Sequence, residues 1–112
     1  MIAMDVIRTD IQDAIEKELA DANERFPLFA SMHEAAAVIA EEHDEAVESL
    51  NRCTLMYNTA WDFVKKNRTA DALLCFNALL HEAENLASEA CQVAAMCEKA
   101  IQSEGSRKNG KV

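Results

Sequence analysis

Glycine and proline are almost absent from this chain of 112 residues, which contains two glycines and one proline. These residues form most of the tight turns that connect β-strands, so a strand-rich fold would lack its connections here. Between Pro27 and Gly105 the chain is dominated by alanine, leucine and long polar side chains, which helices accommodate well. The composition therefore predicts an all-α fold in a single domain.

The spacing of apolar residues predicts three long helices that form an antiparallel bundle. The expected ranges are 5–23, 31–66 and 69–103. Ser31 and Glu34 have the spacing of a capping box, which marks the start of the second helix. The polar and basic segment 104–112 is predicted to be a disordered tail that follows one helical domain over residues 1–103.

Each predicted helix carries an apolar stripe that is expected to be buried. In the first helix the stripe consists of Ile7, Ile11, Ile15 and Leu19. In the second it consists of Ala35, Ile39, Ala46, Val47 and Leu50, continued by Thr54, Tyr57, Trp61 and Val64. In the third it consists of Ala72, Cys75, Leu79, Leu86, Ala90, Val93, Cys97 and Ile101. Three helices cannot cover all of this surface, so a homodimer or a dimer of dimers built on the second and third helices is expected.

The formal net charge of −9 argues against binding to a nucleic-acid polymer or to an anionic membrane. No apolar run is long enough to span a membrane, and acids stand near the N-terminus where a signal peptide requires an apolar core. The four cysteines show no Cys-x-x-Cys spacing and fall within helical patterns: Cys53, Cys75, Cys91 and Cys97. A cytoplasmic protein with free thiols is expected, with a zinc site or a disulfide as the alternatives.

An unbalanced acidic segment occupies the first half of the second helix. No Lys or Arg occurs between Phe26 and Asn51, where the acids are Glu34, Glu41, Glu42, Asp44, Glu45 and Glu48. Like charges three or four residues apart destabilise a helix by about 0.2–0.5 kcal/mol per pair, which favours a bound cation. Glu42 lies on the flank of the apolar face, and Glu45 lies one turn later on the same side. The alternative is a solvated charged face from which Glu42 reaches water.

The third helix has a matching polar edge beside its apolar stripe. This edge contains Ala78, Glu82, Asn85, Glu89, Gln92 and Met96. Glu42-x-x-Glu45 and Glu89-x-x-Gln92 both have i,i+3 spacing, so each pair projects from one side of its helix. Packed antiparallel, the two pairs could surround Mg²⁺, which prefers carboxylate oxygens and substrate phosphates. In the connector between the first two helices, Phe26 and Phe29 are expected to plug the helix ends or to stack on a base.

Two segments resemble a known family. Residues 29–45, FASMHEAAAVIAEEHDE, followed by residues 89–96, EACQVAAM, resemble the MazG-like family. The resemblance is to its small bacterial and phage members, which carry the patterns FxSxHEGYAVIxEExDEL and EAxQVAAM. It implies an all-α nucleoside triphosphate pyrophosphohydrolase that works as a dimer or tetramer. Such an enzyme cleaves the α–β phosphoanhydride of a nucleoside triphosphate to a nucleoside monophosphate and pyrophosphate.

The resemblance also implies a metal site made of Glu42, Glu45, Glu89 and Gln92, which would hold Mg²⁺ or Mn²⁺. Glu42 and Glu45 match the first acidic pair of the family, and Glu89 matches the first member of the second pair. Gln92 stands where the family usually has aspartate. Its amide keeps a carbonyl oxygen but carries no charge, so weaker metal binding is expected. Ala35 and Ala36 also replace the Gly-Tyr of the small members.

Further roles are implied on the same basis. Glu41 or Glu45 is the candidate proton acceptor in catalysis. The candidate outer ligands around the metal are Glu34, Glu82 and Asn85, and the candidate phosphate-binding cations are Lys65, Lys66, Arg68 and Lys99. Some of these cations would come from a neighbouring subunit. The competing hypothesis, which Gln92 favours, is a catalytically inactive helical homo-oligomer that acts as a nucleotide-binding or interaction module.

Overall fold

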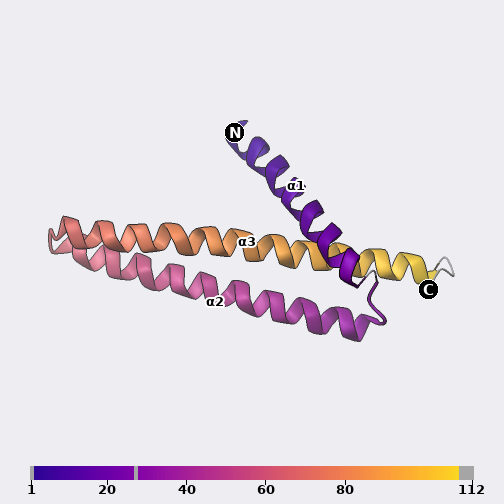
Figure 1. The fold of residues 1–112 in the computed structure, drawn as a ribbon. Coiled ribbons are helices and arrows are strands. Elements are labelled where there is room, and N and C mark those ends of the chain that lie inside the picture. The colour runs from indigo at the N-terminus through magenta and orange to yellow at the C-terminus, as the bar shows by residue number, and fades with distance from the viewer. Residues whose placement is uncertain (1, 27, 109–112) are drawn as a thin grey trace. The chain divides into compact units, whose positions relative to one another are not determined.

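The computed structural model describes residues 2–26 and 28–108, and every regular element in these ranges is an α-helix (Figure 1). The helices are α1 (Ile2–Arg25), α2 (Met32–Lys65) and α3 (Thr69–Lys108). The predicted all-α fold and the three helices are confirmed, with each boundary within a few residues of expectation except the end of α3. None of the described helices combines the length and the apolar character that crossing a membrane requires.

Ser31 caps the N-terminus of α2, as its spacing from Glu34 predicts. The backbone N–H of Glu34 donates a hydrogen bond of 3.1 Å to the hydroxyl oxygen of Ser31. The backbone N–H of Ala35 donates to the carbonyl oxygen of Ser31 at 3.1 Å and begins the helical pattern. A cap of this kind stabilises a helix by about 1 kcal/mol, and it fixes where α2 leaves the connector.

A tight turn at Asn67 joins α2 to α3. Asn67 has a φ of 58°, a left-handed conformation that asparagine tolerates better than most residues other than glycine. The N–H of Arg68 donates to the carbonyl of Phe63 at 2.9 Å, and the N–H of Asn67 donates to the carbonyl of Val64 at 3.0 Å. This pair of bonds is a Schellman motif, which ends α2 and allows the chain to reverse within three residues.

The chain divides into two compact units. The terminal unit comprises Met1–His43 and Ala90–Val112, and the hairpin unit comprises Asp44–Glu89. In the hairpin unit, residues 44–65 of α2 and 69–89 of α3 lie side by side and run in opposite directions (Figure 1). The terminal unit therefore combines segments from both ends of the sequence, whereas the hairpin unit is one continuous stretch.

The core of the hairpin unit is made of small side chains. Ser49, Cys53 and Ala60 of α2 and Ala72 of α3 are buried there. Small residues at these positions let the two helix backbones approach closely. In this part of α2, the sequence prediction placed the buried face one residue later along the helix. That prediction is wrong for the large side chains of the predicted stripe.

Many of the large apolar side chains of the hairpin unit are exposed, and eight of them directly follow inward-facing residues. On α2 they are Val47, Leu50, Tyr57, Trp61 and Val64, which were predicted to continue a buried stripe. On α3 they are Leu73, Phe76 and Leu80. Each follows an inward-facing residue by one position, and one residue corresponds to a rotation of about 100° around a helix. The eight side chains therefore turn away from the contact between the two helices.

Ser103 anchors the terminal unit. Its buried hydroxyl donates a hydrogen bond to the carbonyl of Lys99 at 2.8 Å and accepts one from the backbone N–H of Phe29 at 2.9 Å. The second bond ties the connector to α3, and a buried hydrogen bond of this kind contributes about 0.5–1.5 kcal/mol to stability. Phe29 itself is almost completely buried.

Both ends of the terminal unit differ from expectation. In α1 the predicted stripe is buried only at Leu19, whereas Ile7 and Ile11 are exposed. Helix α3 continues to Lys108, so the prediction that the disordered tail starts at residue 104 is wrong for its first five residues. The hydrogen bonds of Ser103 hold the preceding turn in place, and a single glycine at position 105 costs a helix only about 1 kcal/mol. Residues 109–112 of the predicted tail lie outside the described residues.

Candidate functional site

A cavity of about 600 Å³ lies within the terminal unit, a volume typical of small-molecule sites. It is formed by the last turns of α1, the connector, the first turns of α2 and the C-terminal half of α3. Its charged and amide side chains are Glu18, Asp21, Arg25, Glu34, Glu42, Gln92 and Lys99. Its apolar lining consists of Ala22, Phe26, Phe29, Val38 and Met96.

Four residues singled out by the sequence converge on this cavity. Glu34 and Glu42 of α2 are eight residues apart, and Gln92 and Lys99 of α3 are seven apart, so each pair spans two turns of one helix face. The sequence predicts Glu42 and Gln92 as metal ligands, Glu34 as an outer ligand and Lys99 as a phosphate-binding cation. These different roles belong to a single site, so their meeting in one cavity is chemically coherent.

Lys99 is the most buried charged residue of the cavity, with 3% of its surface exposed. Its ammonium group donates a hydrogen bond of 3.5 Å to the carbonyl of Ala22 and lies 4.8 Å from the centre of the Phe29 ring. Burial lowers the pKa of Lys99 below its ordinary value, and the negative charge of Glu34 partly opposes that shift. A buried ammonium group is costly unless an anion balances it, so Lys99 favours an anionic ligand in the cavity.

The lining as a whole carries an excess of negative charge. Four of its side chains are acidic, and two, Arg25 and Lys99, are basic. A phosphate group alone would meet repulsion from the carboxylates. A phosphate that arrives with a divalent cation satisfies both sets of charges, because the metal reverses the local sign. The charge pattern thus favours a metal-bound phosphate over free phosphate.

The two phenylalanines of the connector have different environments. Phe29 is buried beneath Lys99, in agreement with the prediction that it plugs a helix end. Phe26 lines the cavity but is 71% exposed, so the same prediction is wrong for Phe26. The backbone N–H of Phe26 donates a hydrogen bond to the carbonyl of Ala22, so Phe26 directly follows the last turn of α1. An exposed ring at the rim of a cavity is suited to stacking on a flat ligand.

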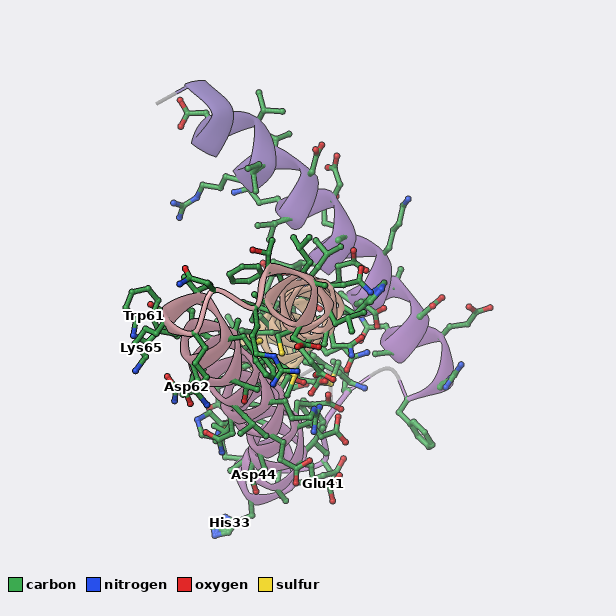
Figure 2. All side chains as sticks on the ribbon, turned by 90° about the vertical axis from the view of Figure 1, so that its left-hand side faces the viewer. His33, Glu41, Asp44, Trp61, Asp62 and Lys65 are labelled. Atoms are coloured by element: carbon green, nitrogen blue, oxygen red, sulfur yellow. The ribbon has the colours of Figure 1, made fainter. Side chains whose placement is uncertain are left out.

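The remaining predicted metal ligands and the candidate proton acceptors lie outside the cavity. Glu45 and Glu89 belong to the hairpin unit, so the predicted set of four is divided between the two units. Glu41, a candidate proton acceptor, is exposed on α2 and does not line the cavity (Figure 2). In the part of the chain that the structure describes, no three His, Cys, Asp or Glu side chains form a group able to hold a metal ion by themselves.

A polar network joins the two helices of the hairpin unit. The Ser49 hydroxyl donates a 2.7 Å hydrogen bond to Oε1 of Glu89 and accepts a 3.0 Å bond from Nη2 of Arg52. The Nε of Arg52 donates a 2.8 Å bond to Oε2 of Glu82. This bond holds the pKa of Glu82 below its ordinary value, and Asn85 adds a smaller hydrogen-bond contribution. Both Glu82 and Glu89 are thus engaged in holding α2 against α3.

The cations at the α2–α3 turn also have local contacts. Lys65 pairs with Asp62 at 3.3 Å, and Arg68 pairs with Asp71 at 2.6 Å. Lys66 is exposed at the end of the same unit. Exposed ion pairs of this kind contribute less than about 1 kcal/mol each, so they do not prevent these side chains from binding other anions.

Two groups of residues escaped the sequence prediction. Glu18, Asp21 and Arg25 of α1 were not among the predicted site residues, but they line the cavity. Their i, i+3, i+7 spacing places them on one helix face that leads to the connector, which is a signal that could have found them. Arg52 was also missed, although it is the only Lys or Arg between Arg25 and Lys65.

Comparison with protein-family models gives no match to this chain. Neither the curated proteins nor the solved structures searched include a match.

Proposed function

We propose that the protein is a metal-dependent nucleoside triphosphate pyrophosphohydrolase, or a weakened relative of one, whose nucleotide binds in the cavity of the terminal unit. The observation that carries the proposal is the convergence of Glu42, Gln92 and the buried Lys99 on that cavity. The reaction class comes from the resemblance to the MazG-like family in residues 29–45 and 89–96. The excess of carboxylates in the lining supports a ligand that carries a divalent cation.

Each part of the ligand has a chemical counterpart in the lining. Lys99 and Arg25 are the cations available to bind phosphate oxygens. Glu42 and the amide oxygen of Gln92 would hold Mg²⁺ or Mn²⁺. Mg²⁺ commonly uses only one or two carboxylates and completes its shell with water and phosphate oxygens, so the absence of a larger acidic group among the described residues does not conflict with this assignment. Phe26 at the rim would contact the base.

Hydrolysis of the α–β bond also requires a proton acceptor. A bound metal would supply charge neutralisation on the phosphates and a more acidic attacking water. Glu41 and Glu45 remain the acceptors that the family resemblance implies. Glu34, a carboxylate of the cavity beyond Glu42, is a third candidate and also lies close enough to influence Lys99. Lys65, Lys66 and Arg68 remain proposed phosphate-binding residues, supplied by a neighbouring subunit.

The direct test is a panel of ribo- and deoxyribonucleoside triphosphates incubated with the protein and millimolar Mg²⁺ or Mn²⁺. We expect release of pyrophosphate and the corresponding monophosphate from at least one of them, and no release in the presence of a chelator. Release of inorganic phosphate instead of pyrophosphate would contradict cleavage at the α–β bond. Nucleotide binding without hydrolysis, measured by calorimetry, would support the inactive binding module.

The inactive alternative is favoured by one observation, the amide at position 92. Gln92→Asp adds a negative charge to the cavity wall opposite Glu42's helix and so distinguishes the two functions. In a weakened enzyme we expect about tenfold tighter Mg²⁺ binding and faster pyrophosphate release. In a binding module the variant gains no turnover and is less stable, because an added carboxylate without a metal is costly. Metal titration and the pyrophosphate assay measure the two effects separately, with Gln12→Asp on the exposed face of α1 as the control.

A further inference from the structure

Eight of the exposed large apolar side chains of the hairpin unit form two regular rows, and the other two, Leu55 and Leu74, lie outside these rows. On α2, Val47, Leu50, Tyr57, Trp61 and Val64 follow the alternating three- and four-residue spacing of a heptad, with Thr54 in the one remaining position. On α3, Leu73, Phe76 and Leu80 have the same spacing, which Ala83 and Ala87 continue. This is the pattern of a helix that packs on another helix, and neither row faces the other helix of the hairpin.

Both rows lie on the same side of the hairpin. On each helix the exposed row follows the inward-facing row by one position, a rotation of about 100°. Because α2 and α3 run in opposite directions, the two rotations have opposite sense when viewed from one end of the hairpin. They therefore bring both rows to one face, which we call the outer apolar face. Figure 2 shows one of its members, Trp61, projecting outward from α2 beside Lys65.

The size of the outer apolar face suits a protein partner. Its large side chains are between 39% and 60% exposed. Together they leave on the order of 700 Å² of apolar side-chain surface, more than most monomeric proteins expose in one patch. A stable protein–protein interface buries about 800 Å² on each partner, so this face alone approaches the required area.

The charges that flank the face identify the partner. Asp44 and Lys65 are 21 residues apart, which is three heptads, so they occupy the same flank at opposite ends of the α2 row. Around these two residues the acidic end of the hairpin unit contains Asp44, Glu45 and Glu48, and the turn end contains Lys65, Lys66 and Arg68. A second copy can be related to the first by a two-fold axis that lies in the interface and is perpendicular to the helices. This rotation places the acidic end of each hairpin beside the basic end of the other.

We propose that the outer apolar face binds the same face of a second copy of this chain, with the two α2 helices antiparallel, so that two hairpins form a four-helix bundle. Lys65 of each protomer then lies beside Asp44 of its partner. A parallel arrangement would instead bring like charges together at both ends. The proposal does not depend on the proposed hydrolase function, because it uses only residues of the hairpin unit.

Matched leucines make the interface testable. Leu80 lies near the middle of the outer apolar face and is 55% exposed, whereas Leu55 of α2 is 59% exposed on the side away from it. By light scattering at micromolar concentration we expect a mass of about 25 kDa for the native chain and for Leu55→Glu, twice the 12.4 kDa of one chain. For Leu80→Glu we expect a monomer. A carboxylate would be buried in the interface, so the dissociation constant of the dimer should rise at least about 100-fold. Circular dichroism verifies that each variant remains helical.

A charge exchange tests the antiparallel orientation independently. Lys65→Glu and Asp44→Lys should each raise the dissociation constant, and the double variant should return it to within about threefold of the native value. A native chain that is monomeric at micromolar concentration overturns the proposal. So does a dimer that Leu80→Glu leaves intact, or one that Leu55→Glu disrupts equally. A dimer that Leu80→Glu disrupts but the charge exchange does not restore overturns the antiparallel arrangement.

Discussion

Replacing Glu42 with glutamine is expected to reduce metal-dependent pyrophosphate release by about 100-fold or more. Glu42 of α2 lines the same cavity as Gln92 and Lys99 of α3. Glutamine has nearly the same shape but no charge, so the change removes the strongest of the proposed metal ligands and leaves the packing of the cavity in place. The rate is measured with the best triphosphate of the panel at saturating Mg²⁺.

The control for this variant is Glu48→Gln, the same chemical change at an exposed position of α2 in the hairpin unit. It should leave the rate within about twofold of the native value. A second measurement applies even to a protein that does not hydrolyse nucleotides. Millimolar Mg²⁺ should raise the melting temperature of the native chain and of Glu48→Gln, because a ligand that binds only the folded state stabilises it. Glu42→Gln should show little or no increase. An equal response of the two variants would show that the acids of α2 form a solvated face.

Replacing Lys99 with methionine should have opposite effects on ligand binding and on stability. Loss of the ammonium group should weaken binding of nucleoside triphosphate by about 10- to 100-fold, since a hydrogen bond to a charged group contributes about 1.5–3 kcal/mol. In the free protein, methionine fills a similar volume without a buried charge. We expect the free energy of unfolding at neutral pH to rise by about 1 kcal/mol, despite the lost contacts with Ala22 and Phe29.

The pH dependence of this gain has a defined sign. Burial lowers the pKa of Lys99 in the folded state below 10.5, so the unfolded chain binds the proton more tightly. The destabilising effect of Lys99 is therefore complete below its lowered pKa and fades as the pH rises towards 10.5. The stability difference between Lys99→Met and the native chain should shrink over that interval in denaturant titrations. A variant that loses stability but retains nucleotide affinity would show that Lys99 has only a structural role. Lys17→Met, at an exposed position of α1 outside the cavity lining, is the matched control.

The helices could be predicted from the sequence because their signals are local. Ser31 and Glu34 form the expected cap, and the shortage of glycine and proline left few places where α2 or α3 could end. The side of α2 that faces α3 was harder to predict. The sequence offers two adjacent rows, one small and partly polar and one large and apolar, and hydrophobicity alone favours the large row. Close packing of small residues around Ser49 and Cys53 decided in favour of the other.

The candidate site was predictable only in part for a related reason. Glu42 and Gln92 could be identified because each is a polar residue beside an apolar stripe, and Lys99 because it is one of the few cations of α3. The contribution of α1 could not, since Asp21 and Arg25 lie on a charged helix face that resembles an ordinary solvated surface. Their position against the cavity depends on contacts such as that between Ala22 and Lys99, which are 77 residues apart in the sequence.

These long separations have a consequence for how the protein folds. Within the hairpin unit, the polar contacts between helices join residues 30 and 40 positions apart. In the terminal unit the corresponding contacts join residues 74 to 79 positions apart. Closing a longer loop costs more conformational entropy unless an intervening segment is already ordered, so the hairpin should form early and shorten the distance that the chain ends must search. The cavity is then the last part of the molecule to assemble, and local unfolding should open it before the hairpin separates.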